Sequence, residues 1–198
     1  MISLITCKPE YILDVGCGNG LTAKTIKEKF DSKYVLGIEV DREAAKEAEK
    51  KLDEILVIDL NKTKLELNRK FDLIVLADIL EHLVSPEDLL NQIRSILNID
   101  GQVVISIPNV RNWSIIFEII FKGDWRYRDE GILDRTHLRF FTKKSAIRMI
   151  ESTGFTINKY CYRIRPRDVI PNLISLTIFR DFFITQHYFS LKLKEGKT

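Results

Sequence analysis

Three closely spaced glycines constrain the fold of this chain more than any other feature. Gly16, Gly18 and Gly20 directly follow the apolar run Tyr11–Val15 and precede a helical pattern that begins near Leu21. Glycine permits a tight turn and lets the backbone approach a ligand closely. The pattern therefore predicts a strand, a ligand-binding turn and a helix at the start of an α/β fold.

The first half of the chain continues this alternation of strands and helices. Its short apolar runs are continuous rather than alternating, which is typical of parallel strands covered on both faces. Asp41, Ser85 and Thr142 stand where helix N-caps are expected, and Pro86 follows Ser85 at a first helical position. We therefore expect an open, doubly wound, mostly parallel sheet. Its strands are expected at residues 11–15, 34–38, 55–58, 73–77 and 103–107, with two later strands near 156–163 and 187–194.

Composition limits the class of protein. A length of 198 residues is typical of a single domain, and a net charge of only +3 does not favour a nucleic-acid partner. Cys7, Cys17 and Cys161 form neither a paired framework nor a zinc pattern. No unbroken apolar stretch is long enough for a membrane span. We interpret the chain as a cytoplasmic protein without a metal site.

The glycine spacing distinguishes between two adenosine cofactors. Dinucleotide-binding loops use G-x-G-x-x-G, whereas the third glycine here comes one residue earlier. With Asp14 in front, this spacing resembles the first motif of class I S-adenosylmethionine-dependent methyltransferases. Glu39 at the end of the second strand, Asp59 after the third, the segment 71–83 and the segment 99–102 resemble later motifs of the same family.

This resemblance covers residues 11 to about 108, and 154 onward resembles the family's last two strands. It implies a Rossmann-like sheet of seven strands with an antiparallel last strand, and S-adenosylmethionine as cofactor. Glu39 would bind the ribose hydroxyls and Asp59 would lie beside the adenine. The cofactor-binding residues implied are Asp14, Gly16, Cys17, Gly18, Gly20, Glu39, Val40, Asp59, Leu60, Ala77, Asp78 and His82.

The family resemblance leaves the substrate open. We expect O- or N-methylation of a small-molecule or glycan acceptor, in a methyltransferase of the type 11, 12 or 23 kind. A nicotinamide-dependent oxidoreductase and a non-catalytic methyltransferase-like binding protein are the alternatives. Ala77-Asp78-Ile79-Leu80 stands where base-modifying enzymes carry Asn-Pro-Pro-Tyr or Asp-Pro-Pro-Tyr, which also disfavours nucleic acid.

Two histidines are candidates for catalysis. His82 follows the fourth strand, and its alternative role is to orient the loop. His137 lies in a D-x-x-H-x-R-x-F-T pattern that resembles a subgroup of small methyltransferases, where it would face the substrate as a general base. The alternative is that Asp134, Arg135, His137 and Arg139 form an ion-pair network. His187 is expected to be structural or exposed.

The segment 109–141 is expected to be a substrate-binding or lid insertion after the fifth strand. Trp113, Ile116, Phe117, Ile120 and Phe121 recur at helical spacing before Gly123. This apolar face could be core, a hinged lid or a homodimer contact. The later aromatic residues are expected to cover the sheet edge or to make a peripheral membrane contact; they are Phe179, Phe182, Phe183, Tyr188 and Phe189.

Overall fold

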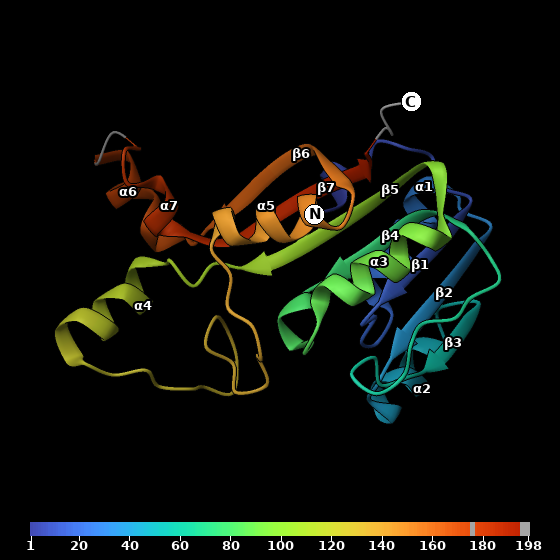
Figure 1. Cartoon of the computed structure of the whole chain (residues 1–198), viewed down its shortest axis with the longest axis horizontal. Coiled ribbons are helices and arrows are strands. Elements are labelled where there is room, and N and C mark those ends of the chain that lie inside the picture. The colour runs from blue at the N-terminus through green and yellow to red at the C-terminus, as the bar shows by residue number, and fades with distance from the viewer. Residues whose placement is uncertain (175–176, 195–198) are drawn as a thin grey trace.

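A computed structural model describes residues 1–174 and 177–194 and contains one seven-stranded sheet (Figure 1). The strand order is β3-β2-β1-β4-β5-β7-β6. β7 is antiparallel to both β5 and β6, and the other neighbouring pairs are parallel. The mostly parallel sheet with an antiparallel last strand is therefore confirmed. The strands are β1 (Tyr11–Val15), β2 (Tyr34–Glu39), β3 (Glu54–Val57), β4 (Phe71–Ala77), β5 (Leu97–Pro108), β6 (Phe155–Ile164) and β7 (Ile184–Leu193).

Helices cover both faces of this sheet because each face is apolar. One core cluster joins the buried strand residues to α3 and α5, and the other joins them to α1, α2 and the short η1. In Figure 1 α3 and α5 lie in front of the sheet, and α1 and α2 lie behind it. The bounds are η1 (Ile2–Leu4), α1 (Leu21–Phe30), α2 (Arg42–Glu49), α3 (Pro86–Ile96) and α5 (Lys143–Ser152).

Two of the three expected helix caps form. The Asp41 side chain accepts from the Ala44 N–H at the start of α2, and Thr142 makes a reciprocal capping box with Ser145 at α5. Ser85 occupies the N-cap of α3, but its side chain makes no capping hydrogen bond. The start of α3 is therefore set by Pro86, whose φ is fixed at a helical value.

β5 is much longer than the expected 103–107. The family-like turn at 99–102 is instead part of this strand, and the pairing with β4 shifts between Phe71↔Leu97 and Leu73↔Gln102. A bulge of this kind absorbs extra residues without breaking the ladder. Gly101 belongs there because a Cβ would lie only 2.8 Å from the Asn98 carbonyl oxygen.

The segment between β5 and α5 projects from the sheet (Figure 1). It contains α4 (Trp113–Phe117) and a π-helical turn, η3 (Glu118–Lys122), which ends at Gly123 with φ 60°. The interpretation of its apolar face as core is wrong, because Ile120 and Phe121 are 65% and 72% exposed. The Phe121 ring contacts Phe117 of α4, with centroids 4.8 Å apart, and α4 also buries Ile115.

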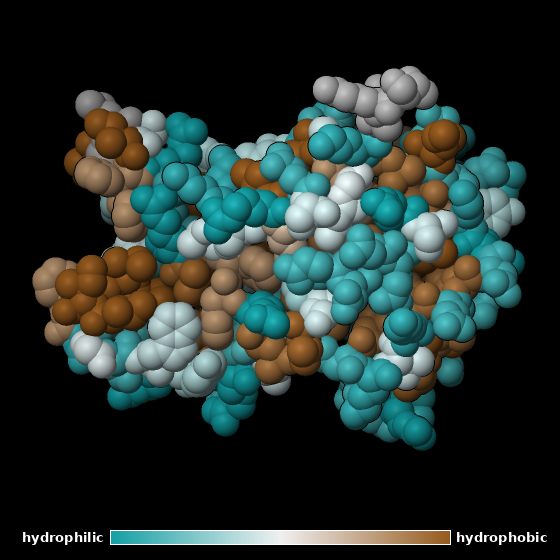
Figure 2. Space-filling view, in the orientation of Figure 1, coloured by the Kyte–Doolittle hydropathy of each residue, from teal (hydrophilic) through white to brown (hydrophobic). Residues whose placement is uncertain are grey.

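The late aromatic residues also divide between core and surface. Phe189 is fully buried in β7, whereas Phe179 is 57% exposed beside α6 (Pro166–Ile174) and α7 (Arg180–Phe183). Phe189 therefore belongs to the core, and the expectation that Phe179 covers the sheet edge is wrong. Figure 2 shows the exposed apolar side chains of the α4 and α6 regions as two separate brown areas. Among the described helices, none is long and apolar enough to cross a membrane.

Candidate active site

A cavity lies at the carboxyl ends of β1 and its neighbours, where successive strands stop being added on one side of β1 and start being added on the other. β1 lies between β2 and β4, so the loops leaving these strands diverge at their carboxyl ends, where open α/β sheets bind ligands. A cavity of about 360 Å³ opens there. It is lined by Gly16, Ile38, Glu39, Val40, Ile58, Asp59, Leu60, Asn61, Asp78, Ile79, His82, Leu83 and Thr136.

The glycine loop fits this position because its backbone is left-handed. Gly16 and Gly20 have φ values of 72° and 77°, which side chains of L-residues rarely adopt. A Cβ on Gly16 would come within 3.0 Å of Ile79, and one on Gly20 within 3.1 Å of the Ala48 backbone. The loop therefore needs glycine both for its turn and for its close contact with Ile79, which follows β4, and with α2.

Glu39 connects the second strand to this loop. Its carboxylate accepts hydrogen bonds from the Gly18 N–H at 2.8 Å and from the Val40 and Asp41 N–H groups at 2.8 and 2.9 Å. Three donors to one carboxylate fix its orientation. Glu39 remains half-buried on the cavity wall, so its free lone pairs can accept from a ligand hydroxyl.

Asp14 and Cys17 lie beneath the loop and do not line the cavity. Asp14 is 1% exposed, and its Oδ1 has no hydrogen-bond partner. Burial, with the Glu39 charge nearby, raises the Asp14 pKa to about 7. Burial and the same two carboxylates raise the Cys17 pKa to about 12, so this thiol is not an activated nucleophile.

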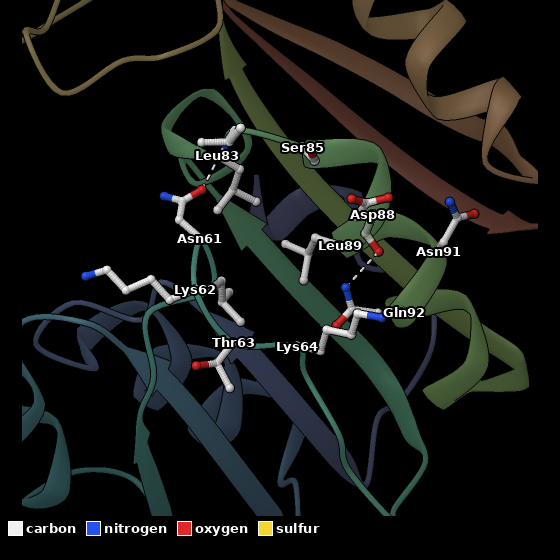
Figure 3. Close-up of a pocket in the computed structure, with 12 residues that line it drawn as sticks. Asn61, Lys62, Thr63, Lys64, Leu83, Ser85, Asp88, Leu89, Asn91 and Gln92 are labelled. Carbon is white, nitrogen blue, oxygen red and sulfur yellow. Dashed lines mark hydrogen bonds between the residues drawn. The ribbon is translucent and has the colours of Figure 1, made fainter.

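Asp59 stands on the opposite wall, after β3. Its carboxylate accepts from the Asn61 N–H at 3.0 Å and pairs with Lys62 at 2.8 Å, and the hydrogen bond from Lys62 lowers the Asp59 pKa. Asn61 in turn donates to the His82 carbonyl and accepts from the Val84 N–H. Figure 3 shows the Asn61 side chain hydrogen-bonded to the loop after β4, beside a groove of about 460 Å³ along α3; the bond drawn is the one from the Val84 N–H. Asn61 thus ties two cavity walls together.

Asp78 ends β4 in an unusual backbone conformation. Its φ is 54°, which aspartate tolerates better than most residues. Its Oδ1 accepts from the Ser106 hydroxyl at 2.9 Å and from Gln186, so β5 and β7 both hold the side chain. These bonds hold the Asp78 carboxylate at the carboxyl end of β4, in the middle of the sheet.

A second, larger cavity of about 770 Å³ adjoins the first. Asp78 and His82 line both cavities, so the two spaces meet at the end of β4. The wall of the larger cavity comes mostly from the 109–141 segment and from the ends of β6 and β7. Its other lining residues are Glu81, Pro108, Ser114, Ile115, Arg128, Glu130, Gly131, Ile132, Leu133, Asp134, His137, Arg163, Arg165, Thr185 and Gln186.

His82 and His137 meet at this boundary. Their ring centroids are 4.7 Å apart, and the rings meet edge to face. The His137 Nδ1 lies 3.0 Å from the Ile132 carbonyl oxygen, which can only accept, so Nδ1 carries the proton and Nε2 has a free lone pair. Burial lowers the His137 pKa, which keeps this ring neutral at pH 7.

Glu81 lies in the short η2 (Leu80–His82), immediately beside them. It is 1% exposed, and its Oε1 is 4.0 Å from the His137 Nε2. Burial and the Asp78 charge raise the Glu81 pKa to about 8. Its backbone carbonyl accepts from the Leu138 and Arg139 N–H groups, which fastens the 109–141 segment to η2.

The alternative of an ion-pair network around His137 is wrong. Asp134 accepts from Thr136, Arg135 pairs with Asp129, and Arg139 donates to the Val84 carbonyl. These side chains bond to other residues rather than to one another. His187 is buried, with its Nδ1 2.9 Å from the Tyr160 hydroxyl, so it is structural rather than exposed.

The structure brings together most, but not all, of the expected site residues. Those that line the first cavity are Gly16, Glu39, Val40, Asp59, Leu60, Asp78 and His82. Those that do not line it are Asp14, Cys17, Gly18, Gly20 and Ala77. Glu81, Asn61 and Thr136 also contribute to the site and were not predicted from the sequence. Only Glu81 carried a signal, as an acid beside His82 within the fourth-strand motif.

Comparison with known proteins identifies the family. Residues 3–160 match the model of the methyltransferase domain family, so the chain belongs to that family. This membership decides against the nicotinamide-dependent oxidoreductase.

Two curated relatives and one solved structure illustrate the match. The chain is 32% identical over 124 residues to a mitochondrial ubiquinone biosynthesis O-methyltransferase of Saccharomyces cerevisiae, covering 59% of this chain and 39% of that protein. It is 24% identical over 121 residues to an (S)-tetrahydroprotoberberine N-methyltransferase of Eschscholzia californica, covering 59% and 35%. The chain thus spans well under half the length of either relative.

The solved structure shows that the fold is shared. It is an O-methyltransferase from a trans-AT polyketide synthase of Brevibacillus brevis, in complex with S-adenosyl-L-homocysteine. The TM-score is 0.63 at 17% identity, with 94% of this chain and 67% of that chain covered.

Proposed function

We propose that this chain transfers a methyl group from S-adenosylmethionine to an oxygen or nitrogen of a small-molecule or glycan acceptor. The observation that carries this proposal is the Glu39 carboxylate. It fixes the glycine loop through Gly18 and faces the cavity at the sheet's switch point. Membership of the methyltransferase domain family supports the same conclusion.

The walls of the first cavity suit an adenosine and its charged tail. Glu39 would accept the ribose hydroxyls, and Asp59 with Leu60 and Val40 would hold the adenine. Gly16, Asp78 and His82 would face the methionine portion. Asp14, Cys17, Gly18, Gly20 and Ala77 would act from beneath by shaping the loop and the end of β4.

The larger cavity would hold the acceptor. When bound, S-adenosylmethionine supplies a methyl group activated by its positively charged sulfur. The protein's contribution is to align the acceptor with that methyl group, which can supply much of the rate enhancement. His137 presents a neutral Nε2 to this cavity and can take the proton of a hydroxyl or ammonium acceptor. His82, at the boundary between the two cavities, would orient both ligands.

We further propose that residues 1–198 form one methyltransferase domain with 109–141 as its acceptor-side insertion. Small molecules rather than nucleic acid are the proposed substrates, since the net charge is only +3. The exposed Ile120 and Phe121 suit a homodimer contact, and the exposed Phe179 suits a peripheral membrane contact. A cytoplasmic location is supported by three cysteines that are all unpaired.

The test is a binding experiment followed by an activity screen. Calorimetry should show S-adenosylhomocysteine binding and no binding of nicotinamide dinucleotides. A panel of phenols, amines and glycans is then incubated with S-adenosylmethionine, and products are examined by mass spectrometry for an added methyl group. Cofactor binding without any methylated product across the panel would favour the non-catalytic alternative. Failure to bind the cofactor would refute the proposal.

A further inference from the structure

Three possible metal ligands converge where the two cavities meet. Glu81 and His82 come from η2, and His137 comes from the 109–141 segment. One ligand atom from each residue lies within 4.8 Å of the others. Glu81 and His82 are neighbours in the chain, whereas His137 is far from both, so the fold brings His137 to them.

The Glu81 carboxylate has no hydrogen-bond partner among the described residues. Its side chain is 1% exposed, and neither Oε1 nor Oε2 receives a hydrogen bond. Burial of a carboxylate without a partner costs several kcal/mol, and buried charges are normally paired or coordinate metals. The two backbone bonds from Leu138 and Arg139 to the Glu81 carbonyl hold the residue in this position.

The two histidines are oriented as metal ligands usually are. Nδ1 of His137 lies 3.0 Å from the Ile132 carbonyl oxygen, and Nδ1 of His82 lies 3.2 Å from the Thr136 carbonyl oxygen. The Thr136 hydroxyl, 3.1 Å from the same His82 nitrogen, donates its own proton to Asp134 and can therefore accept from His82. Such hydrogen bonds fix a tautomer that leaves Nε2 free for a metal.

We propose that Glu81, His82 and His137 bind a divalent transition-metal ion; with the ion bound, the His137 Nε2 is a ligand and no longer a base. Two imidazoles and one carboxylate suit Zn²⁺, Fe²⁺, Mn²⁺ or Co²⁺, whereas Mg²⁺ and Ca²⁺ prefer all-oxygen sites. Metal–ligand bonds of about 2.0–2.2 Å place neighbouring ligand atoms roughly 3–3.5 Å apart. The 4.0 Å between the His137 Nε2 and the Glu81 Oε1 closes to this range with less than about 1 Å of side-chain movement.

Three protein ligands leave coordination positions open toward the larger cavity, which Glu81, His82 and His137 all line. An oxygen of the acceptor can occupy such a position. The substrate class is then a molecule with a hydroxyl or carboxylate oxygen able to bind a metal, such as a vicinal diol or a hydroxy acid. This assignment of the acceptor rests on the proposed function, whereas the metal site itself does not.

The experiment titrates the purified full chain with Co²⁺, whose visible absorption reports its ligands. We expect one bound ion per chain with a nitrogen and oxygen spectrum. Glu81→Gln and His137→Ala should each weaken binding by more than the roughly 10- to 100-fold caused by loss of an outer-shell partner. Glu130→Gln is the matched control, since it changes an acid of the same cavity outside the cluster, and it should bind Co²⁺ unchanged.

Melting temperature and S-adenosylhomocysteine affinity are measured on the same samples. Glu81→Gln preserves side-chain shape, so it should remain folded. Its melting temperature should no longer rise on addition of Co²⁺, as that of the unmodified chain should. A folded chain that binds no Co²⁺, variants that bind it as the unmodified chain does, or an intense thiolate charge-transfer band would each overturn the metal site. If S-adenosylhomocysteine still binds in that case, the proposed function stands; if only metal binds, the proposed function fails.

Discussion

Replacement of Glu39 with Ala should weaken S-adenosylmethionine binding far more than removal of an ordinary surface carboxylate. The Glu39 side chain both orients the glycine loop and faces the cofactor cavity. The substitution leaves the N–H groups of Gly18, Val40 and Asp41 without their carboxylate acceptor. These groups can turn to water, so we expect the chain to fold and the loss to appear in binding.

The magnitude follows from the hydrogen bonds. A hydrogen bond to a charged group contributes roughly 1.5–3 kcal/mol, and two ribose hydroxyls would bond to this carboxylate. Loss of both, at the lower limit, costs about 3 kcal/mol, which is about a 100-fold increase in Kd. Glu39→Gln should weaken binding less than Glu39→Ala does, because the amide retains one acceptor oxygen. It should still weaken binding, because the amide NH₂ group faces one of the backbone N–H donors.

Calorimetry with S-adenosylhomocysteine measures both variants. Glu43→Ala is the matched control, since Glu43 is an exposed acid on the neighbouring α2 that pairs with Lys46. We expect its Kd to stay within about twofold of the unmodified chain, because exposed ion pairs contribute little. If Glu39→Ala were to bind as tightly as the control, the assignment of Glu39 to the ribose would be refuted.

Three further changes test other parts of the account. Asp14→Asn should remove a pH dependence of the free energy of unfolding. The pKa of Asp14 in the folded chain is about 7, above its ordinary value of 3.8. The free energy of unfolding is therefore highest below about pH 4 and falls by up to about 4 kcal/mol as the pH rises through 7. Urea unfolding at several pH values measures this, and an unchanged slope between pH 4 and 7 in the variant would contradict it. His137→Ala should lower turnover by roughly 10²- to 10⁴-fold while cofactor affinity is retained, and full activity would leave His137 without a role as base. Gly37→Ala should lower the free energy of unfolding by about 1–3 kcal/mol, because a Cβ would lie 2.6 Å from Ile55 and 2.7 Å from the Cys17 Sγ; a melting temperature equal to that of the unmodified chain would contradict this packing.

The sheet could be predicted from the sequence because its signals are local. Continuous apolar runs mark buried parallel strands, and the Gly16–Gly20 spacing marks the turn that follows β1. Asp41 and Thr142 cap their helices with groups only three residues away. Ser85 shows the limit of such signals, since Pro86 defines the helix start without the serine side chain.

The acceptor side could not be predicted in the same way. Glu81 becomes important because residues of the 109–141 segment cover it and bring His137 within 4.0 Å. That proximity depends on long-range backbone hydrogen bonds to the Glu81 carbonyl, which no spacing in the sequence reveals. Similarly, Ile120 and Phe121 have the helical spacing of a core face, but the described fold supplies no element to cover them.

A crystal structure of the chain with S-adenosylhomocysteine would show where the cofactor lies relative to Glu39. We predict the ribose hydroxyls on the Glu39 carboxylate, the adenine beside Asp59, and the sulfur directed toward the boundary at Asp78 and His82. A ligand seated away from Glu39, or one whose sulfur faces away from the larger cavity, would contradict this account.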